Sequence, residues 1–179
     1  MLSHIYNFLV DKKPSNEAEI VPITTAVVAP QKSANSQGIS FKPALVNELK
    51  NDHIRLVTLF GQMWDDCFAK GDYEKLGQVL ESFKYEFQTH ILKENVNFYA
   101  YLEQTLTGDN HSLAVIREFR RDMNDIANTV IKFCRKYKSE FFSSELKKEF
   151  QKDYSAIGEA LTKRVTLEER DLYPMYQPR

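Results

Sequence analysis

The stretch His90–Tyr99, with the sequence HILKENVNFY, decides the fold, because a related stretch, RVTLEERDLY, follows at Arg164–Tyr173. Each copy has a glutamate four residues after its first position and a tyrosine nine residues after it. Side chains at i and i+4 lie on one face of an α-helix, and a His–Glu pair placed in this way inside a bundle is a metal-ligand unit. The second copy keeps the glutamate but has an arginine instead of the histidine. The repeat therefore predicts a duplicated helical unit whose halves differ in their capacity to bind metal.

Helical patterns continue on both sides of the two copies. We expect helices at about 43–70, 73–106, 111–137 and 144–173. Gly71 and the loop 107–110 separate the first three, Ser144 is a candidate N-cap of the last, and Pro174 ends it. Four long helices with short connections predict an all-α fold, an up-down-up-down four-helix bundle.

The first 40 residues differ in character from the rest. An apolar patch, Ile5–Val10, precedes charged residues and then a stretch rich in Pro, Ser and Asn. We expect residues 1–40 to form a short N-terminal helix and a flexible tether, and residues 41–179 to form the bundle. The patch lacks the basic region of a signal peptide, and no apolar run approaches the ~20 residues of a spanning helix. A cytoplasmic protein with no stable membrane span is therefore expected, in which the patch docks on the bundle.

Composition excludes several classes of function. The 179 residues suffice for one domain with a real core, and the net charge of −1 argues against a nucleic-acid partner. Cys67 and Cys134 are too few for a disulfide framework and are expected to be reduced thiols. We recognise neither a glycine-rich phosphate loop nor a Ser–His–Asp or Cys–His arrangement. The sequence therefore predicts a protein that is not an enzyme and has no catalytic residues.

Apolar stripes place polar side chains in the core of the predicted bundle. On each helix, apolar residues recur with the helical period, and polar residues interrupt three of the four stripes midway. The residues at these central positions are His53, Met123, the pair His90 and Glu94, and the pair Arg164 and Glu168. Buried imidazoles and carboxylates are costly without partners, so the carboxylates need a metal ion or an arginine.

Three segments carry a resemblance to a known family. They are Asn51–His53, Thr89–Asn95 and Leu167–Pro174. Together they resemble the hemerythrin-like cation-binding domain, also called the HHE domain, over about residues 41–176. The resemblance implies a four-helix bundle that holds two non-haem irons and binds oxygen, senses iron or redox state, or stores iron.

The same resemblance implies where the ligands stand. The family's ligand positions fall on His53, His90, Glu94 and Glu168. Met123 and Arg164 stand where the family pattern has histidines. A thioether is a poor ligand for iron beside carboxylates, and a guanidinium remains protonated and cannot bind a cation. The sequence therefore argues against a full diiron centre.

Two states of the site remain open from the sequence. In one, a single metal ion is bound, and Arg164 points away or pairs with Glu168 and Glu169. In the other, the bundle is metal-free and Arg164 bridges Glu94 and Glu168 through its five donors. The spacing on the last helix favours Glu168 over Glu169 as the inward residue.

A second, more local resemblance predicts a different function. The segment Phe150–Glu168 is similar to the last helix of the bacterial regulators of sigma D, which are helical bundles that sequester a sigma factor. That family lacks a metal centre and tolerates Met123 and Arg164. The alternative is thus a metal-free regulatory bundle with a protein partner, and the oligomeric state is open in both interpretations.

Overall fold

The computed structural model describes residues 38–139 and 141–179, so the N-terminal patch and most of the expected tether lie outside the described residues. The described part is helical and contains no β-strand. Its elements are α2 (Leu45–Gln62), the π-helical η1 (Met63–Cys67), the 3-10 helix η2 (Phe68–Lys70), α3 (Tyr73–Lys93), the π-helical η3 (Glu94–Tyr99), α4 (Ala100–Thr105), α5 (Asn110–Lys136), α6 (Ser144–Leu167), the π-helical η4 (Glu168–Leu172) and the 3-10 helix η5 (Tyr173–Met175). None of these helices is both long enough and apolar enough to cross a membrane.

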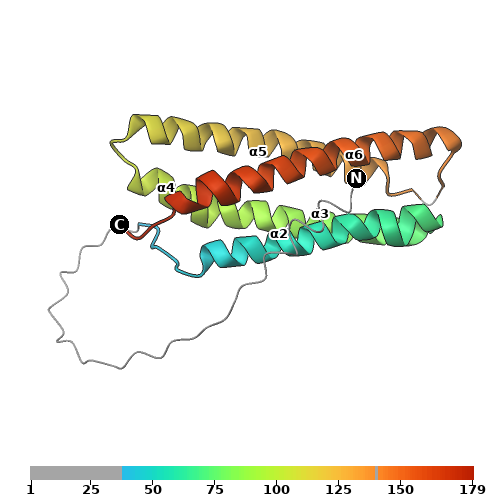
Figure 1. Ribbon diagram of the computed structural model, residues 1–179, viewed down its shortest axis with the longest axis horizontal. Coiled ribbons are helices and arrows are strands. Elements are labelled where there is room, and N and C mark those ends of the chain that lie inside the picture. The colour runs from blue at the N-terminus through green and yellow to red at the C-terminus, as the bar shows by residue number, and fades with distance from the viewer. Residues whose placement is uncertain (1–37, 140) are drawn as a thin grey trace, which may run out of the picture.

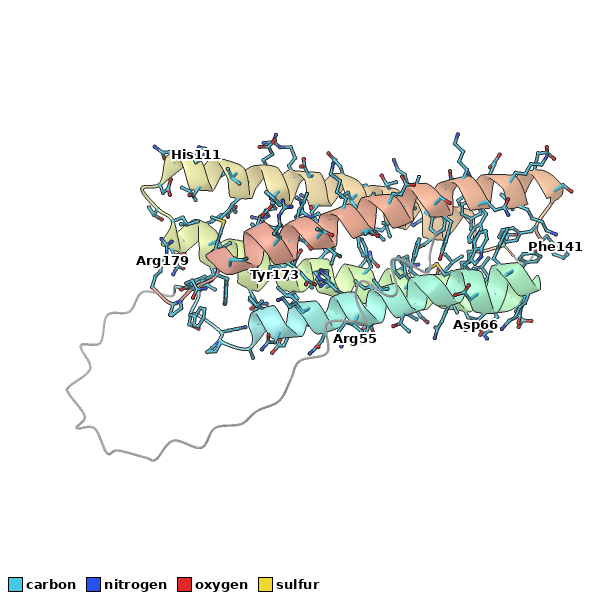
Figure 2. The ribbon with its side chains drawn as sticks, in the orientation of Figure 1. Arg55, Asp66, His111, Phe141, Tyr173 and Arg179 are labelled. Carbon is cyan, nitrogen blue, oxygen red and sulfur yellow. The ribbon has the colours of Figure 1, made fainter. Side chains whose placement is uncertain are left out.

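The helices form the predicted four-helix bundle. α2 packs against α3, α3 against α5 and α5 against α6, and successive long helices run in opposite directions (Figure 1). The hydroxyl of Tyr154 on α6 donates a hydrogen bond of 2.8 Å to the carbonyl of Phe60 on α2, which joins the last helix to the first. Phe141 and Arg179 mark opposite ends of the bundle (Figure 2). The up-down-up-down topology is therefore confirmed.

The helix ends follow from local sequence signals. Gly71 has a φ of 73°, a left-handed conformation that favours glycine, and it ends the first helical stretch. The side chain of Asp72 then caps α3. At the start of α6 the capping side chain is Ser143, which accepts a hydrogen bond from the amide of Leu146. The expected N-cap Ser144 is instead the first residue of the helix, so this prediction was off by one residue.

A polar layer divides the core into two apolar clusters. The larger cluster contains, among others, Leu56, Phe60, Met63, Phe83, Phe87, Met123, Phe133, Phe150 and Tyr154. The smaller cluster contains Leu45, Leu49, Phe98, Tyr99, Tyr101, Leu102, Leu106, Ile116, Leu172, Tyr173 and Tyr176. Along α2, and along α3 with η3, the buried polar residues Asp52, His53, His90 and Glu94 fall between the two sets. The bundle therefore holds its buried polar and charged side chains midway along its length.

Two π-helical turns change which residues share a face. η3 begins at Glu94 and η4 begins at Glu168, the equivalent residues of the two repeat copies. In an α-helix, residues five apart point about 140° away from each other, because one turn takes 3.6 residues. A π-helical turn with i→i+5 hydrogen bonds brings such residues onto one face. Tyr99 and Tyr173, each five residues after its glutamate, are therefore buried in the same core.

Candidate metal centre

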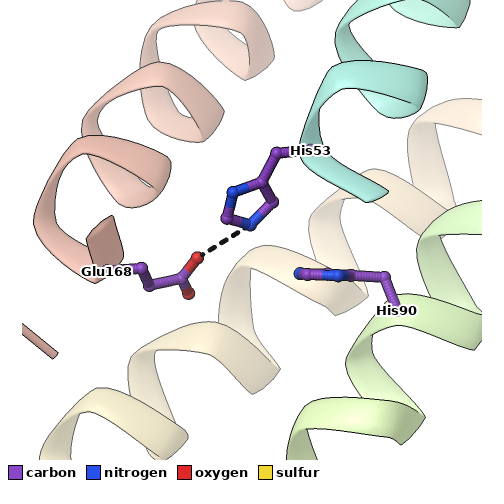
Figure 3. A group of neighbouring side chains, drawn as sticks. All are labelled: His53, His90 and Glu168. Atoms are coloured by element: carbon purple, nitrogen blue, oxygen red, sulfur yellow. Dashed lines mark ion pairs between the residues drawn. The ribbon is translucent and has the colours of Figure 1, made fainter. Parts of the chain in front are cut away.

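The polar layer collects five ionisable side chains from three stretches of helix, which are α2, α3 with η3, and α6 with η4. His53 comes from α2, and His90 and Glu94 come from the junction of α3 and η3. Arg164 and Glu168 come from the junction of α6 and η4. All five are buried, and Glu94 and Glu168 are no more than 1% exposed. Figure 3 shows His53, His90 and Glu168 pointing toward one another across the interior.

His53 is held between two carboxylates. Its Nε2 lies 3.3 Å from Oε2 of Glu168, and its Nδ1 lies 3.1 Å from Oε1 of Glu169. Burial alone lowers the pKa of an imidazole, but the hydrogen bonds of Glu168 and Glu169 outweigh it and raise the pKa of His53 to about 9. The prediction that Glu168 faces the core is confirmed, because it is 1% exposed. Glu169 is less buried and reaches the same imidazole from its outer side.

Arg164 neutralises the second half of the layer. Its Nε donates to Oε1 of Glu168 at 2.5 Å, and a terminal nitrogen donates to the hydroxyl of Tyr99 at 2.7 Å. Its guanidinium also lies 5.0 Å from the centre of the Phe119 ring, within the range of a cation–π contact. A bridge from Arg164 to Glu94, which belonged to one of the two states left open by the sequence, is not formed. Glu94 instead accepts a hydrogen bond of 3.1 Å from the hydroxyl of Tyr173.

Two tyrosines that were not predicted as site residues, Tyr99 and Tyr173, belong to the site. Tyr173, from the second repeat copy, contacts His53 and Glu94 of the first half of the bundle. Tyr99, from the first copy, contacts Arg164 of the second half. Each tyrosine thus crosses to the opposite unit. The signal was present in the sequence, since the tyrosine is one of the two residues that both copies share at the same position.

Asp52 contacts His90, the second histidine of the polar layer. It is 5% exposed, and its Oδ2 lies 3.5 Å from Nδ1 of His90 and accepts a hydrogen bond of 2.6 Å from Lys93. Arg55 forms an ion pair with its other oxygen. Burial alone raises the pKa of a carboxyl, but His90 and Lys93 outweigh it and lower the pKa of Asp52 to about 2. The Asp52 contact to His90 has the distance of an ion pair without the angle of a hydrogen bond.

Burial and the charges of neighbouring groups shift the pKa values of Glu94, Glu168 and His90 in different directions. Burial first, and the charge of Glu168 second, raise the pKa of Glu94 to about 8. Burial also raises the pKa of a carboxyl at Glu168, but His53 and Arg164 outweigh it, so the pKa of Glu168 is lowered. Burial lowers the pKa of His90. Near neutral pH, His53 is therefore charged, His90 is neutral, Glu168 is ionised and Glu94 holds a proton.

The spacing of the donor atoms fits one metal ion. Two ligand atoms about 2.1 Å from one ion lie about 3.0 Å apart at a right angle, about 3.4 Å at a tetrahedral angle and about 4.2 Å when opposite. The 3.3 Å between His53 and Glu168 and the 3.9 Å between His90 and Glu94 fall in this range. Donor atoms of His53, His90 and Glu168 all lie within 4.8 Å of one another, slightly wider than about 4.2 Å, so these side chains would have to move inward by a small amount to share one ion. Among the described residues, Oε2 of Glu94 is a buried oxygen that accepts no hydrogen bond, which suits a cation ligand.

The donor set does not fit a second ion. On the side of the layer that holds Arg164, one oxygen of Glu168 is occupied by a permanent guanidinium cation. Met123 is buried in the larger apolar cluster and supplies only a thioether. At an effective dielectric near 20, a dication within ~5 Å of the guanidinium would be repelled by about 7 kcal/mol. The geometry can therefore accept one cation beside His53, His90, Glu94 and Glu168, but not a pair of ions.

Comparison with known proteins identifies the family of this bundle. The family model described as the hemerythrin HHE cation binding domain matches residues 44–176, which include the whole polar layer. Neither the curated proteins nor the solved structures provide a match. The match covers most of the chain and agrees with the bundle and with the His/Glu cluster at its centre. The chain therefore belongs to the hemerythrin family of HHE cation-binding domains.

Proposed function

We propose that this protein binds a single non-haem iron ion through His53, His90, Glu94 and Glu168. The guanidinium of Arg164 takes the place of the positive charge that a second iron ion would bring. The observation that carries the proposal is the contact of Arg164 with Glu168, which commits one carboxylate oxygen to a fixed cation. The other oxygen of Glu168 faces His53. Iron, when bound, supplies a Lewis-acidic and redox-active centre, and imidazole and carboxylate donors suit it.

Charge balance supports one ion instead of two. Without metal, the protonated His53 and Arg164 balance the carboxylates of Glu168 and Glu169, and Glu94 is neutral because it retains its proton. A divalent ion that displaces the protons of His53 and Glu94 leaves the total charge of the layer unchanged. A second divalent ion would leave an excess of two positive charges in a buried layer, which is costly.

We propose a role in sensing iron, in preference to storing it or carrying oxygen. A sensor needs a folded state with the ion and a folded state without it, which a ligand can then populate differently. The contacts of His53 with two carboxylates, and of Glu94 with Tyr173, satisfy most of the layer without an ion. One ion for each chain is also little capacity for a store. Binding of one ion can therefore change the charge distribution without being required for folding.

The direct test is the metal content of the chain after anaerobic loading with ferrous salt and desalting. We expect one iron per chain by inductively coupled plasma mass spectrometry. His53→Ala and Glu94→Gln should reduce the content, whereas His111→Ala, at an exposed histidine near the start of α5, should not. Arg164→His restores the family's histidine and should raise the content above one. Protein that retains no iron contradicts the proposal, and two irons in the unchanged chain contradict the role given to Arg164.

One observation favours the alternative of a metal-free interaction bundle. Leu92 and Val96 on the outer face of α3 and η3 are 63% and 55% exposed, beside a shallow hollow between α3 and α5. Apolar side chains gathered at a hollow are typical of a surface for a protein partner. If this is the principal function, a photo-crosslinking residue at position 92 should capture one defined protein in cells. The same residue at position 118, on α5, should capture none, and iron content should remain zero.

A further inference from the structure

Tyr173 places a phenol oxygen among the proposed ligand atoms. Its hydroxyl lies 3.3 Å from Nε2 of His53 and 3.1 Å from Oε1 of Glu94, and the residue is 3% exposed. His53 and Glu94 are two of the four proposed ligands, and these are the atoms with which they face the interior. We propose that Tyr173 is an additional ligand of this site and binds a ferric ion as a phenolate. This inference rests on the proposed iron-binding function.

The spacing supports ligation by Tyr173. Two donors on one ion at about 2.1 Å are separated by about 3.0 Å at a right angle and by about 3.4 Å at a tetrahedral angle. The distances from the Tyr173 oxygen to His53 and to Glu94 lie within this interval. The π-helical turn η4 begins at Glu168 and is followed directly by Tyr173, so one helical turn delivers both a carboxylate and a phenol to the layer.

The twin tyrosine shows what distinguishes this position. Tyr99 occupies the equivalent place in the first repeat copy, and its hydroxyl accepts a hydrogen bond from Arg164 at 2.7 Å. An oxygen that faces a fixed guanidinium is a poor neighbour for a second cation. The hydroxyl of Tyr173, in contrast, faces an imidazole and a carboxylate. Because Arg164 occupies the hydroxyl of Tyr99, Tyr173 is the one of these two tyrosines whose oxygen is available for metal.

Charge balance assigns the phenolate to the ferric state. With a divalent ion, Arg164 and the metal together carry three positive charges, and the carboxylates of Glu94, Glu168 and Glu169 carry three negative charges. A ferric ion adds one positive charge, and loss of one proton from Tyr173 restores the balance. In this step the O–H bond of the phenol breaks, the oxygen–iron bond forms and the proton passes to the solvent buffer. A hard anionic oxygen is also a ligand that suits a trivalent ion.

The test uses the full chain and ferric nitrilotriacetate at one equivalent, so no oxidant is required. We expect a visible phenolate-to-iron charge-transfer band, together with tyrosinate ring vibrations in the resonance Raman spectrum excited in that band. Tyr173→Phe should lose both signals while it keeps bound iron by mass spectrometry. Tyr154→Phe, which removes another buried hydroxyl away from the polar layer, should keep both signals. Growth on ring-deuterated tyrosine should shift the vibrations in the unchanged chain, a measurement that needs no variant to fold.

The outcomes separate this inference from the proposed function. A chain that binds no iron contradicts the proposed function itself. A chain that binds iron without a charge-transfer band contradicts only the ligand role of Tyr173. A band that persists in Tyr173→Phe, or that disappears in Tyr99→Phe and not in Tyr173→Phe, also overturns the assignment.

Discussion

Arg164→Met tests whether the buried guanidinium takes the place of a metal ion as the partner of Glu168. The change keeps a long side chain but leaves the carboxylate of Glu168, which is 1% exposed, without its 2.5 Å partner. Removal of one member of a buried ion pair typically costs about 3–5 kcal/mol. His53 still lies 3.3 Å from the other oxygen of Glu168, so we expect the lower limit, about 3 kcal/mol.

Urea denaturation of the metal-free protein measures this cost. With an m-value of about 2 kcal/mol/M, the unfolding midpoint should fall by about 1.5 M. The matched control is Arg170→Met, because Arg170 pairs with Asp171 at the surface, where the two side chains are 65% and 43% exposed. An exposed pair of this kind contributes about 0–1 kcal/mol. The reasoning is refuted if Arg164→Met lowers the free energy of unfolding no more than Arg170→Met does.

A metal ion should change the comparison between the same proteins. An ion present at 100 times its dissociation constant stabilises a folded protein by about 2.7 kcal/mol. Arg164→Met removes a repelling positive charge, so the variant should gain more stability from ferrous iron than the unchanged chain does. Equal gains in both proteins would indicate that Arg164 has no electrostatic contact with the bound ion.

Three further predictions follow from the burial of individual groups. The pKa of His53 is raised to about 9 and that of Glu94 to about 8, so the stability that their protons contribute is present at low pH and is lost as pH rises. Thermal melts of the metal-free protein should therefore show a lower Tm at pH 9 than at pH 6.5. An unchanged Tm would contradict the buried contacts. Asp52→Asn removes the charge beside His90 and should weaken iron binding about 10- to 100-fold by competition with a chelator, as supports of ligand histidines typically do. Burial raises the pKa of Cys134 to about 12, so its thiol should resist iodoacetamide in the native protein and react after unfolding, as mass spectrometry can follow.

The sequence predicts the bundle well because helical periodicity and helix-breaking residues are local signals. The expected helix 73–106 corresponds to α3, η3 and α4, and the expected helix 144–173 ends within one 3-10 turn of the observed end. The inward direction of Glu168 was predicted in the same way, from its place on an apolar stripe. Periodicity of 3.6 residues is sufficient for these features.

The same period fails for the partners within the polar layer. The 3.6-residue period does not apply to a π-helical turn, so it did not predict that Tyr99 contacts Arg164 or that Tyr173 contacts Glu94. It also could not indicate that Glu169 reaches Nδ1 of His53, since that contact depends on the distance between two helices that lie far apart in sequence. Contacts across a core are set by packing, which one helix by itself does not specify.

The division of the core into two apolar clusters has a kinetic consequence. Every proposed ligand is no more than 3% exposed, and apolar side chains lie on both sides of the layer along the bundle. An ion can therefore enter or leave only when helices separate locally, and the free energy of such openings ranges up to that of global unfolding. Exchange of the ion should consequently be limited by the opening rate of the protein rather than by diffusion. A bound ion would then stay on the protein after the surrounding metal concentration has fallen, for longer than its equilibrium affinity alone implies.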